Sequence, residues 1–233
     1  MKKLLFCSGI LVFVSAPSWA AGVCTTGTLA SYISLGSVGC TINDKTFFNF
    51  SEGPLSVGVL AANVGISPLF VALNPGIAVN PNMTVANNTG TGDVFEDLQL
   101  HFSVMVTNGS FVIHDVSLDS TGGFTGTGVA GITELACGGG TFSNPNTGTG
   151  CNGQLVSLTV SNPPAVFHAD MNFPGLVNSV DVFKDVTVHS FALGSAQISS
   201  FTQQFSEVPE PGGIALLGTG LVLFAARRRF RKN

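Results

Sequence analysis

The strongest constraint on the fold is a two-residue alternation of apolar and polar side chains in two segments. Residues 98–106 read LQLHFSVMV, and residues 180–188 read VDVFKDVTV. Because successive side chains of a strand point to opposite faces, this period places one apolar row on one face of a β-sheet. In the second segment Lys184 shares that face with four valines. Burial on one face is typical of the antiparallel sheets of a β-sandwich.

The dipeptide Asn108-Gly109 follows the first segment and is a strong hairpin signal. A two-residue loop would pair Thr107 with Ser110 and place Ser103 opposite His114. In this register His101 and His114 lie on the same face as diagonal neighbours. The sequence therefore predicts a hairpin between residues 98–107 and 110–118.

The composition suits short strands that are joined by many turns. Charged residues make up only 9% of the chain, against about 25% in typical domains, and there are 29 glycines. The segment TGGFTGTGVAG, residues 121–131, is expected to form a bend. We find no fixed-period repeat and no domain boundary within residues 21–206. We therefore expect an all-β body, an antiparallel β-sandwich or jelly-roll-like domain at residues 21–206.

The first 20 residues have the three parts of a secretory signal peptide. Lys2 and Lys3 precede an apolar core at residues 4–14, and the small-x-small site Ser18-Trp19-Ala20 follows. We expect a signal helix at residues 1–20 with cleavage after Ala20. An uncleaved N-terminal anchor is the alternative, but the apolar core is short for one.

Four cysteines remain once Cys7 is removed with the signal peptide. An even number of cysteines in an exported protein indicates disulfides, and three pairings are possible. We favour Cys24–Cys40 and Cys137–Cys151, because each would enclose one short glycine-rich segment. Each loop would stabilise the fold by about 3 kcal/mol on the chain-entropy model. A metal site is the alternative, but no C-x-x-C spacing is present.

The chain ends in three consecutive signals at residues 207–233. The triplet Pro209-Glu210-Pro211 precedes an apolar run at residues 213–226, and Arg227, Arg228 and Arg229 follow. As a helix the run would span about 21 Å, which is short against a hydrocarbon core of about 30 Å. We expect one short transmembrane helix, and the arginines would hold the C-terminus in the cytoplasm.

This tail resembles the PEP-CTERM sorting signal of Gram-negative bacteria, which is sometimes also labelled an ice-binding-protein C-terminal domain. The resemblance rests on V-P-E-P, the glycine-containing apolar run and R-R-R. It implies that an exosortase-type membrane peptidase is a partner and that the inner membrane holds the precursor transiently. It further implies delivery to the cell surface or the extracellular space, with a place in an exopolysaccharide or biofilm matrix.

The charge of the body excludes one class of partner. Residues 21–206 contain two lysines and eleven acids, so the formal charge is −9. Such a body repels nucleic acid phosphates, whereas cations and neutral polymers are compatible with it.

No motif for catalysis or for cofactor binding is present. The glycine-rich stretches match neither a phosphate loop nor a dinucleotide-binding loop, and there is no G-x-S-x-G or H-E-x-x-H. His101 and His114 could share a metal, but we prefer two half-buried histidines because a third ligand is missing. Loop acids could hold calcium, although solubilising surface acids are the preferred interpretation: Asp93, Glu96, Asp97, Asp115, Asp119, Asp181 and Asp185. We expect no metal and no cofactor.

Three functions are compatible with these observations. We favour a non-catalytic structural or interaction protein that is sorted to the cell surface and processed near Pro209–Pro211. A carbohydrate-binding module is the alternative, although the mature chain has one tyrosine and no tryptophan for a sugar-binding platform. A hydrolase with a dispersed Ser, His and Asp site is the third hypothesis.

Overall fold

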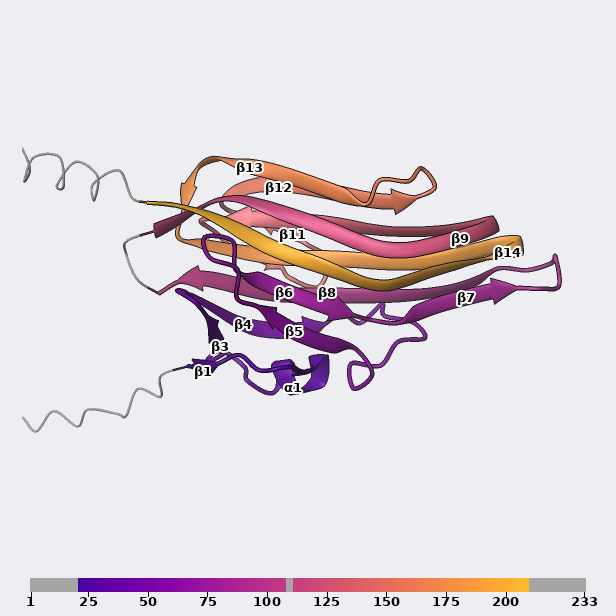
Figure 1. Ribbon diagram of the computed structural model, residues 1–233, viewed down its shortest axis with the longest axis horizontal. Coiled ribbons are helices and arrows are strands. Elements are labelled where there is room, and N and C mark those ends of the chain that lie inside the picture. Colours follow the sequence, from indigo (N-terminus) through magenta and orange to yellow (C-terminus); the bar gives the residue numbers. More distant parts are fainter. Residues whose placement is uncertain (1–20, 108–110, 210–233) are drawn as a thin grey trace, which may run out of the picture.

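The computed structural model describes residues 21–107 and 111–209 of the 233-residue chain. These residues form strands throughout, with one short helix (Figure 1). The elements are β1 (Gly22–Val23), β2 (Gly27–Thr28), α1 (Leu29–Ile33), β3 (Cys40–Ile42), β4 (Lys45–Glu52), β5 (Gly65–Leu69), β6 (Gly76–Asn80), β7 (Met83–Asn87), β8 (Val94–Val106), β9 (Phe111–Gly138), β10 (Phe142–Asn144), β11 (Thr149–Cys151), β12 (Gln154–Asn162), β13 (His168–Val177) and β14 (Ser179–Pro209). The expected all-β class is confirmed.

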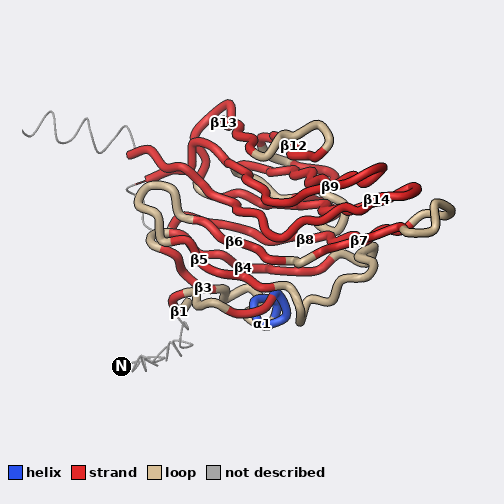
Figure 2. The backbone as a smooth tube through the Cα atoms, turned by 45° about the vertical axis from the view of Figure 1, so that its right-hand side comes forward, coloured by secondary structure: helices blue, strands red, loops and turns tan. Residues whose placement is uncertain are grey.

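Two very long strands organise the molecule. β9 and β14 pair antiparallel along nearly their whole lengths, from Val180 opposite Gly138 to Pro209 opposite Phe111. They lie side by side as one ribbon in both views (Figures 1 and 2). A register shift between Ser190 and Gly194 divides the ribbon into two halves, and each half carries its own neighbours.

The first half of the ribbon joins one part of the sheet, and the second half joins the other. Residues 179–190 of β14 pair with β8, and β4, β3 and β1 follow in order beyond it. Residues 201–204 of β14 pair with β6, and β5 and β2 follow, while β7 pairs with residues 194–198. On the other side of the ribbon, β12 and β13 pair with different halves of β9.

The sheet curls so that its two halves pack face to face over one core. The Phe205 ring, from the second half of β14, lies 5.8 Å from the Phe47 ring of β4 and 6.4 Å from the Phe102 ring of β8, centroid to centroid. All three side chains are buried. The structure is therefore one curled twelve-stranded sheet, and the layers that we expected as a sandwich are its two halves.

Glycines permit the bend of the ribbon at the predicted segment, residues 121–131. Gly126 has a positive φ of 57°, which glycine adopts without strain. A Cβ on Gly128 would collide with the carbonyl oxygen of Ser195, and one on Gly194 would collide with that of Thr125. The two strands therefore approach too closely here for any side chain.

The predicted hairpin between residues 98–107 and 110–118 is wrong. β8 and β9 are consecutive in the chain, but β14 lies between them, because residues 179–190 pair with β8 on one side and β9 on the other. The Thr107 amide donates to the carbonyl of Asp44 instead. Residues 108–110 lie outside the described residues. A local turn signal could not reveal that a strand 70 positions later takes the neighbouring place.

The predicted apolar rows are confirmed as core-facing, but the expected burial on one face only is wrong, because the opposite face is also buried at Gln99, His101, Ser103, Asp181 and Phe183. Every apolar residue of the row from Leu98 to Val104 is buried, as are the four valines from Val180 to Val188. Lys184 is buried with them, and its ammonium binds the Glu134 carboxylate and the side-chain oxygen of Gln203. Burial lowers the pKa of Lys184 and raises that of Glu134, while their mutual attraction opposes both shifts.

The termini of the chain were expected to contain two helices. The signal helix at residues 1–20 and the membrane helix at residues 213–226 lie outside the described residues. Within residues 21–107 and 111–209, no helix has the length and apolar character needed to cross a bilayer.

Replacing Lys184 with Met should strongly destabilise the fold. The change leaves the Glu134 carboxylate buried without its counter-charge, which costs about 3–5 kcal/mol. The double variant Lys184→Met/Glu134→Leu should recover at least half of the loss, because the unpaired charge is gone. Urea unfolding of the three proteins measures this, and a double variant as unstable as the single one would contradict it.

Candidate functional site

The outer face of the sheet carries a groove at the start of β8 and partway along β14, where the ribbon bends. Its cavity is about 510 Å³. Strands β8, β9 and β14 supply most of its wall, which is formed by Asp93, Phe95, Glu96, Val129, Thr187, Val188, His189 and Phe191. This volume lies within the range of about 300–1,000 Å³ that is typical of small-ligand sites.

Three rings form a row across the groove. Phe95 and Phe191 are 51% and 56% exposed, which is unusual for phenylalanine. The centroid of the His189 ring lies 6.0 Å from that of Phe95 and 4.0 Å from that of Phe191, with both pairs edge to face. The row presents apolar ring surface to solvent, as a ligand platform does.

Strand pairing places these side chains together. His189 of β14 is opposite Phe95 of β8 on one side and Val129 of β9 on the other. Directly paired residues share a face, and Val188 next to His189 points into the core. The bend of the ribbon begins immediately beyond this row, between Ser190 and Gly194.

Carboxylates border the row of rings. The Asp93 carboxylate lies 2.5 Å from Nε2 of His189, yet the Asp93 side chain is 51% exposed. Glu96 accepts a hydrogen bond of 2.8 Å from the Thr84 amide. The groove therefore combines apolar rings with negative charge.

A second pair of carboxylates lies beside the groove on the same face. Asp97 is opposite Thr187, a groove residue, and Asp185 is the next outward residue along β14. Burial, the negative charge of Asp185 and a hydrogen bond with it raise the pKa of Asp97 to about 6. Burial also raises the pKa of Asp185.

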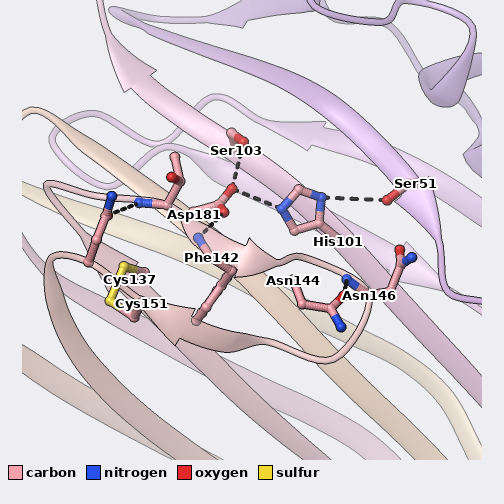
Figure 3. Close-up of polar contacts among 11 residues, drawn as sticks. Ser51, His101, Ser103, Cys137, Phe142, Asn144, Asn146, Cys151 and Asp181 are labelled. Carbon is pink, nitrogen blue, oxygen red and sulfur yellow. Dashed lines mark hydrogen bonds and ion pairs between the residues drawn. A yellow bond between two sulfur atoms is a disulfide. The ribbon is translucent and has the colours of Figure 1, made fainter.

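Further along this face, Asp181 is the centre of a buried polar network (Figure 3). Its Oδ1 accepts hydrogen bonds from Ser103 at 2.7 Å and from Nε2 of His101 at 2.9 Å. Its Oδ2 accepts from the Phe142 amide at 3.0 Å. Burial alone would raise the pKa of Asp181, but these hydrogen bonds lower it below its ordinary value.

The network also brings together a serine, a histidine and an aspartate. Oγ of Ser51 lies 3.5 Å from Nδ1 of His101, whose other nitrogen bonds Asp181 (Figure 3). The order of the groups is that of a nucleophile, a base and an orienting acid. However, 3.5 Å is a long contact, and His101 is only 8% exposed. The network has a structural role instead. The Phe142 amide, which donates to Asp181, attaches the Cys137–Cys151 loop to the sheet.

Both favoured disulfides are present. Cys24–Cys40 joins the start of the domain to β3, with a Cα–Cα distance of 4.8 Å. Cys137–Cys151 closes the loop between β9 and β12, which pair antiparallel, at a Cα–Cα distance of 5.6 Å. The loop itself folds into the small β10–β11 hairpin.

The two histidines that could have shared a metal are separated. His101 bonds Asp181, whereas Nδ1 of His114 lies 3.5 Å from the neighbouring Asp115. The pairing failed because it depended on the hairpin that β14 interrupts. Among residues 21–107 and 111–209, no three His, Cys, Asp or Glu side chains gather as a metal site.

The sorting triplet begins at the end of the folded domain. β14 continues beyond residue 206, our expected domain limit, to Pro209. Glu207 on this last stretch is bound by the buried ammonium of Lys45, which also contacts Asp44 at 3.2 Å. Glu210, Pro211 and the arginines 227–229 lie outside the described residues.

Sequence reasoning missed the groove. The period of two, extended by one residue, places His189 on the face opposite the valines. Phe95 and Phe191 gave no local sign of exposure, because their environment depends on the pairing of β8 with β14.

The described part of the chain is thus an all-β domain with an aromatic, acidic surface groove. Residues 207–229 match the family model of the PEP-CTERM protein-sorting motif, as the tail predicted. This motif marks an exported protein that is anchored in the membrane before cleavage and is processed by exosortase.

Other comparisons give only distant likeness. TmCBM61, solved with β-1,4-galactotriose, has 12% identity and a TM-score of 0.31, covering 73% of this chain and 92% of its own. The family 11 carbohydrate-binding module of Clostridium thermocellum, solved with a mixed-linked tetrasaccharide, has 8% identity and a TM-score of 0.26, covering 70% and 89%. Scores this low carry no conclusion about this chain. No curated protein matches it.

Replacing Asp97 with Asn should stabilise the protein at neutral pH and not at acidic pH. Because the pKa of Asp97 is raised to about 6, its contribution to stability is full below about pH 4 and is lost as pH rises through 6. Asn mimics the protonated acid at every pH. After allowance for solvent screening we expect about 1 kcal/mol, or roughly 2–4 °C in Tm, at pH 7.5.

Thermal melts of the wild type and of Asp97→Asn at pH 4 and 7.5 measure this difference. Asp170→Asn is the control, because it removes a carboxylate that is 66% exposed. An equal shift at both pH values would show that the fold does not raise the pKa of Asp97.

Proposed function

We propose that this protein is a non-catalytic binding protein of the cell surface or extracellular matrix, and that its groove binds an exopolysaccharide. The PEP-CTERM motif at residues 207–229 supports export and sorting. The groove supports a binding role for the body. In this proposal the sorting signal delivers the domain, and the domain contacts the matrix.

The observation that carries the proposal is the exposed ring row of Phe95, His189 and Phe191. Aromatic rings in a groove offer flat apolar surface, and the apolar faces of sugar rings stack on such surface. Hydroxyl groups of a sugar would find an acceptor in the half-exposed carboxylate of Asp93 at the same site. Exposed phenylalanines thereby take the place of the tryptophan that the mature chain lacks and of its one tyrosine, Tyr32, which is buried.

A hydrolase is the second candidate, and the Ser51, His101 and Asp181 contacts favour it. We prefer binding because His101 is buried and both oxygens of Asp181 are already bonded. The test is Ser51→Ala: a hydrolase loses turnover in an ester and glycoside screen, whereas a binding protein has no turnover to lose and retains its ligand.

Replacing Phe191 with Ala should weaken polysaccharide binding by at least ten-fold. A ten-fold loss corresponds to about 1.4 kcal/mol, and an aromatic ring that stacks on a nucleic acid base contributes about 1–3 kcal/mol. The control is Phe70→Ala, which removes an equally exposed ring from the loop after β5. Affinity electrophoresis or calorimetry with the host's exopolysaccharide measures the effect. Equal binding by the two variants would show that the polysaccharide does not bind in the groove.

Processing near Pro209–Pro211 should be visible in the intact mass of the protein from its host. We expect a secreted form that starts at Ala21, ends near this triplet and contains both disulfides. The membrane fraction should contain the longer precursor. A protein that retains Asn233 in every fraction would show that the tail serves as a lasting anchor.

A further inference from the structure

We propose that the groove selects a polysaccharide that carries free amino groups, so that its natural ligand is a cationic amino-sugar polymer. This inference rests on the proposed function, because it names the chemical class of ligand for the same groove. It follows from the charge of the described surface and from the chemistry of the groove wall.

The described surface presents no lysine or arginine. Residues 21–209 contain two basic residues of this kind, Lys45 and Lys184, and both are 0% exposed. Lys45 binds Glu207 and Asp44, and Lys184 binds Glu134. The interior therefore holds the lysine charges, while carboxylates such as Asp93 and Asp170 are at the surface. An anionic polymer would find only histidines such as His168 as cations, whereas a cationic polymer is attracted by the more numerous carboxylates.

The groove concentrates this negative charge beside aromatic rings. An ammonium group is attracted to the face of an aromatic ring within about 6 Å of its centroid. Phe95 and Phe191 provide such rings, and Asp93 provides a carboxylate that remains half exposed although it contacts His189. Rings and a carboxylate at one site bind an ammonium better than either group does alone, because their attractions act on the same charge.

Two further carboxyl groups lie beside the groove wall. Asp97 and Asp185 share the outer face with Thr187 of the groove. Because the pKa of Asp97 is raised to about 6, this pair carries its full negative charge only at higher pH and part of it at pH 6, beside the cavity of about 510 Å³. A neutral sugar gains only hydrogen bonds from such carboxylates, whereas a protonated amine gains hydrogen bonds and charge attraction.

The row of rings favours a polymer of sugar rings over a small amine. Phe95, His189 and Phe191 extend across two strands, with centroid spacings of 6.0 and 4.0 Å. A single ammonium would cover one ring only. A chain of amino sugars places pyranose faces on the rings and amino groups next to the carboxylates at the same time.

The test compares three oligosaccharides of equal length with the full-length chain in non-ionic detergent. The probes are hexamers of glucosamine, N-acetylglucosamine and glucose, measured by calorimetry at about pH 6 and about 50 mM salt, where charge attraction is weakly screened. We expect the glucosamine hexamer to bind at least ten-fold more tightly than the N-acetylglucosamine hexamer. At about 300 mM salt, the logarithm of the ratio between these two affinities should fall to less than half of its value at about 50 mM.

Variants distinguish the groove from general attraction to an acidic body. Asp93→Asn should reduce the preference to about three-fold or less, because it removes the negative charge while keeping a side-chain hydrogen-bond acceptor. Glu96→Gln, which retains an acceptor for the Thr84 amide, should also reduce it. Asp170→Asn makes the same charge change outside the groove wall and should retain the ten-fold preference.

The outcomes separate this inference from the function on which it rests. Equal affinity for all three hexamers, abolished by Phe191→Ala, would overturn the amine preference and leave polysaccharide binding intact. An equal loss of preference in Asp93→Asn and Asp170→Asn would show attraction to the whole body and overturn the assignment to the groove. If no hexamer binds, both proposals fail.

Discussion

The antiparallel pairing of β9 with β14 is the constraint on which the rest of the structure depends. One continuous ribbon contributes strands to both halves of the sheet, and its bend at Gly126 and Gly194 turns one half over the other. The core between Phe205 and the rings of Phe47 and Phe102 exists only because of that bend. The glycines are required there because the two backbones leave no room for a Cβ.

The ribbon also determines where ligand chemistry can occur. Inserting β14 between β8 and β9 places His189 between Phe95 and Val129 and forms the row of rings just before the bend. The same insertion places Asp181 beneath the Cys137–Cys151 loop, whose Phe142 amide it accepts. One end of the outer face is therefore open and aromatic, while the other is covered by a disulfide-bonded loop.

The distribution of charge is as informative as the groove. A domain with two lysines has buried both, at the desolvation cost that every internal ion pair carries. Lys184 joins the two halves of the sheet, because Glu134 lies on the first half of the ribbon and Gln203 on the second. Lys45 holds the end of β14, immediately before the sorting triplet. Both lysines are thus buried in ion pairs, and the described surface is acidic.

The sequence by itself determined the features that depend on short-range order. The period of two in residues 98–106 and 180–188 identified the buried rows, paired cysteines near one another in the chain identified both disulfides, and the tail identified the sorting motif. Tertiary structure alone decided which strands are neighbours, because backbone hydrogen bonds between strands are the same whatever their separation in the chain. For that reason the expected hairpin was wrong, and the groove, which needs Phe95 beside His189, could not be read from the sequence.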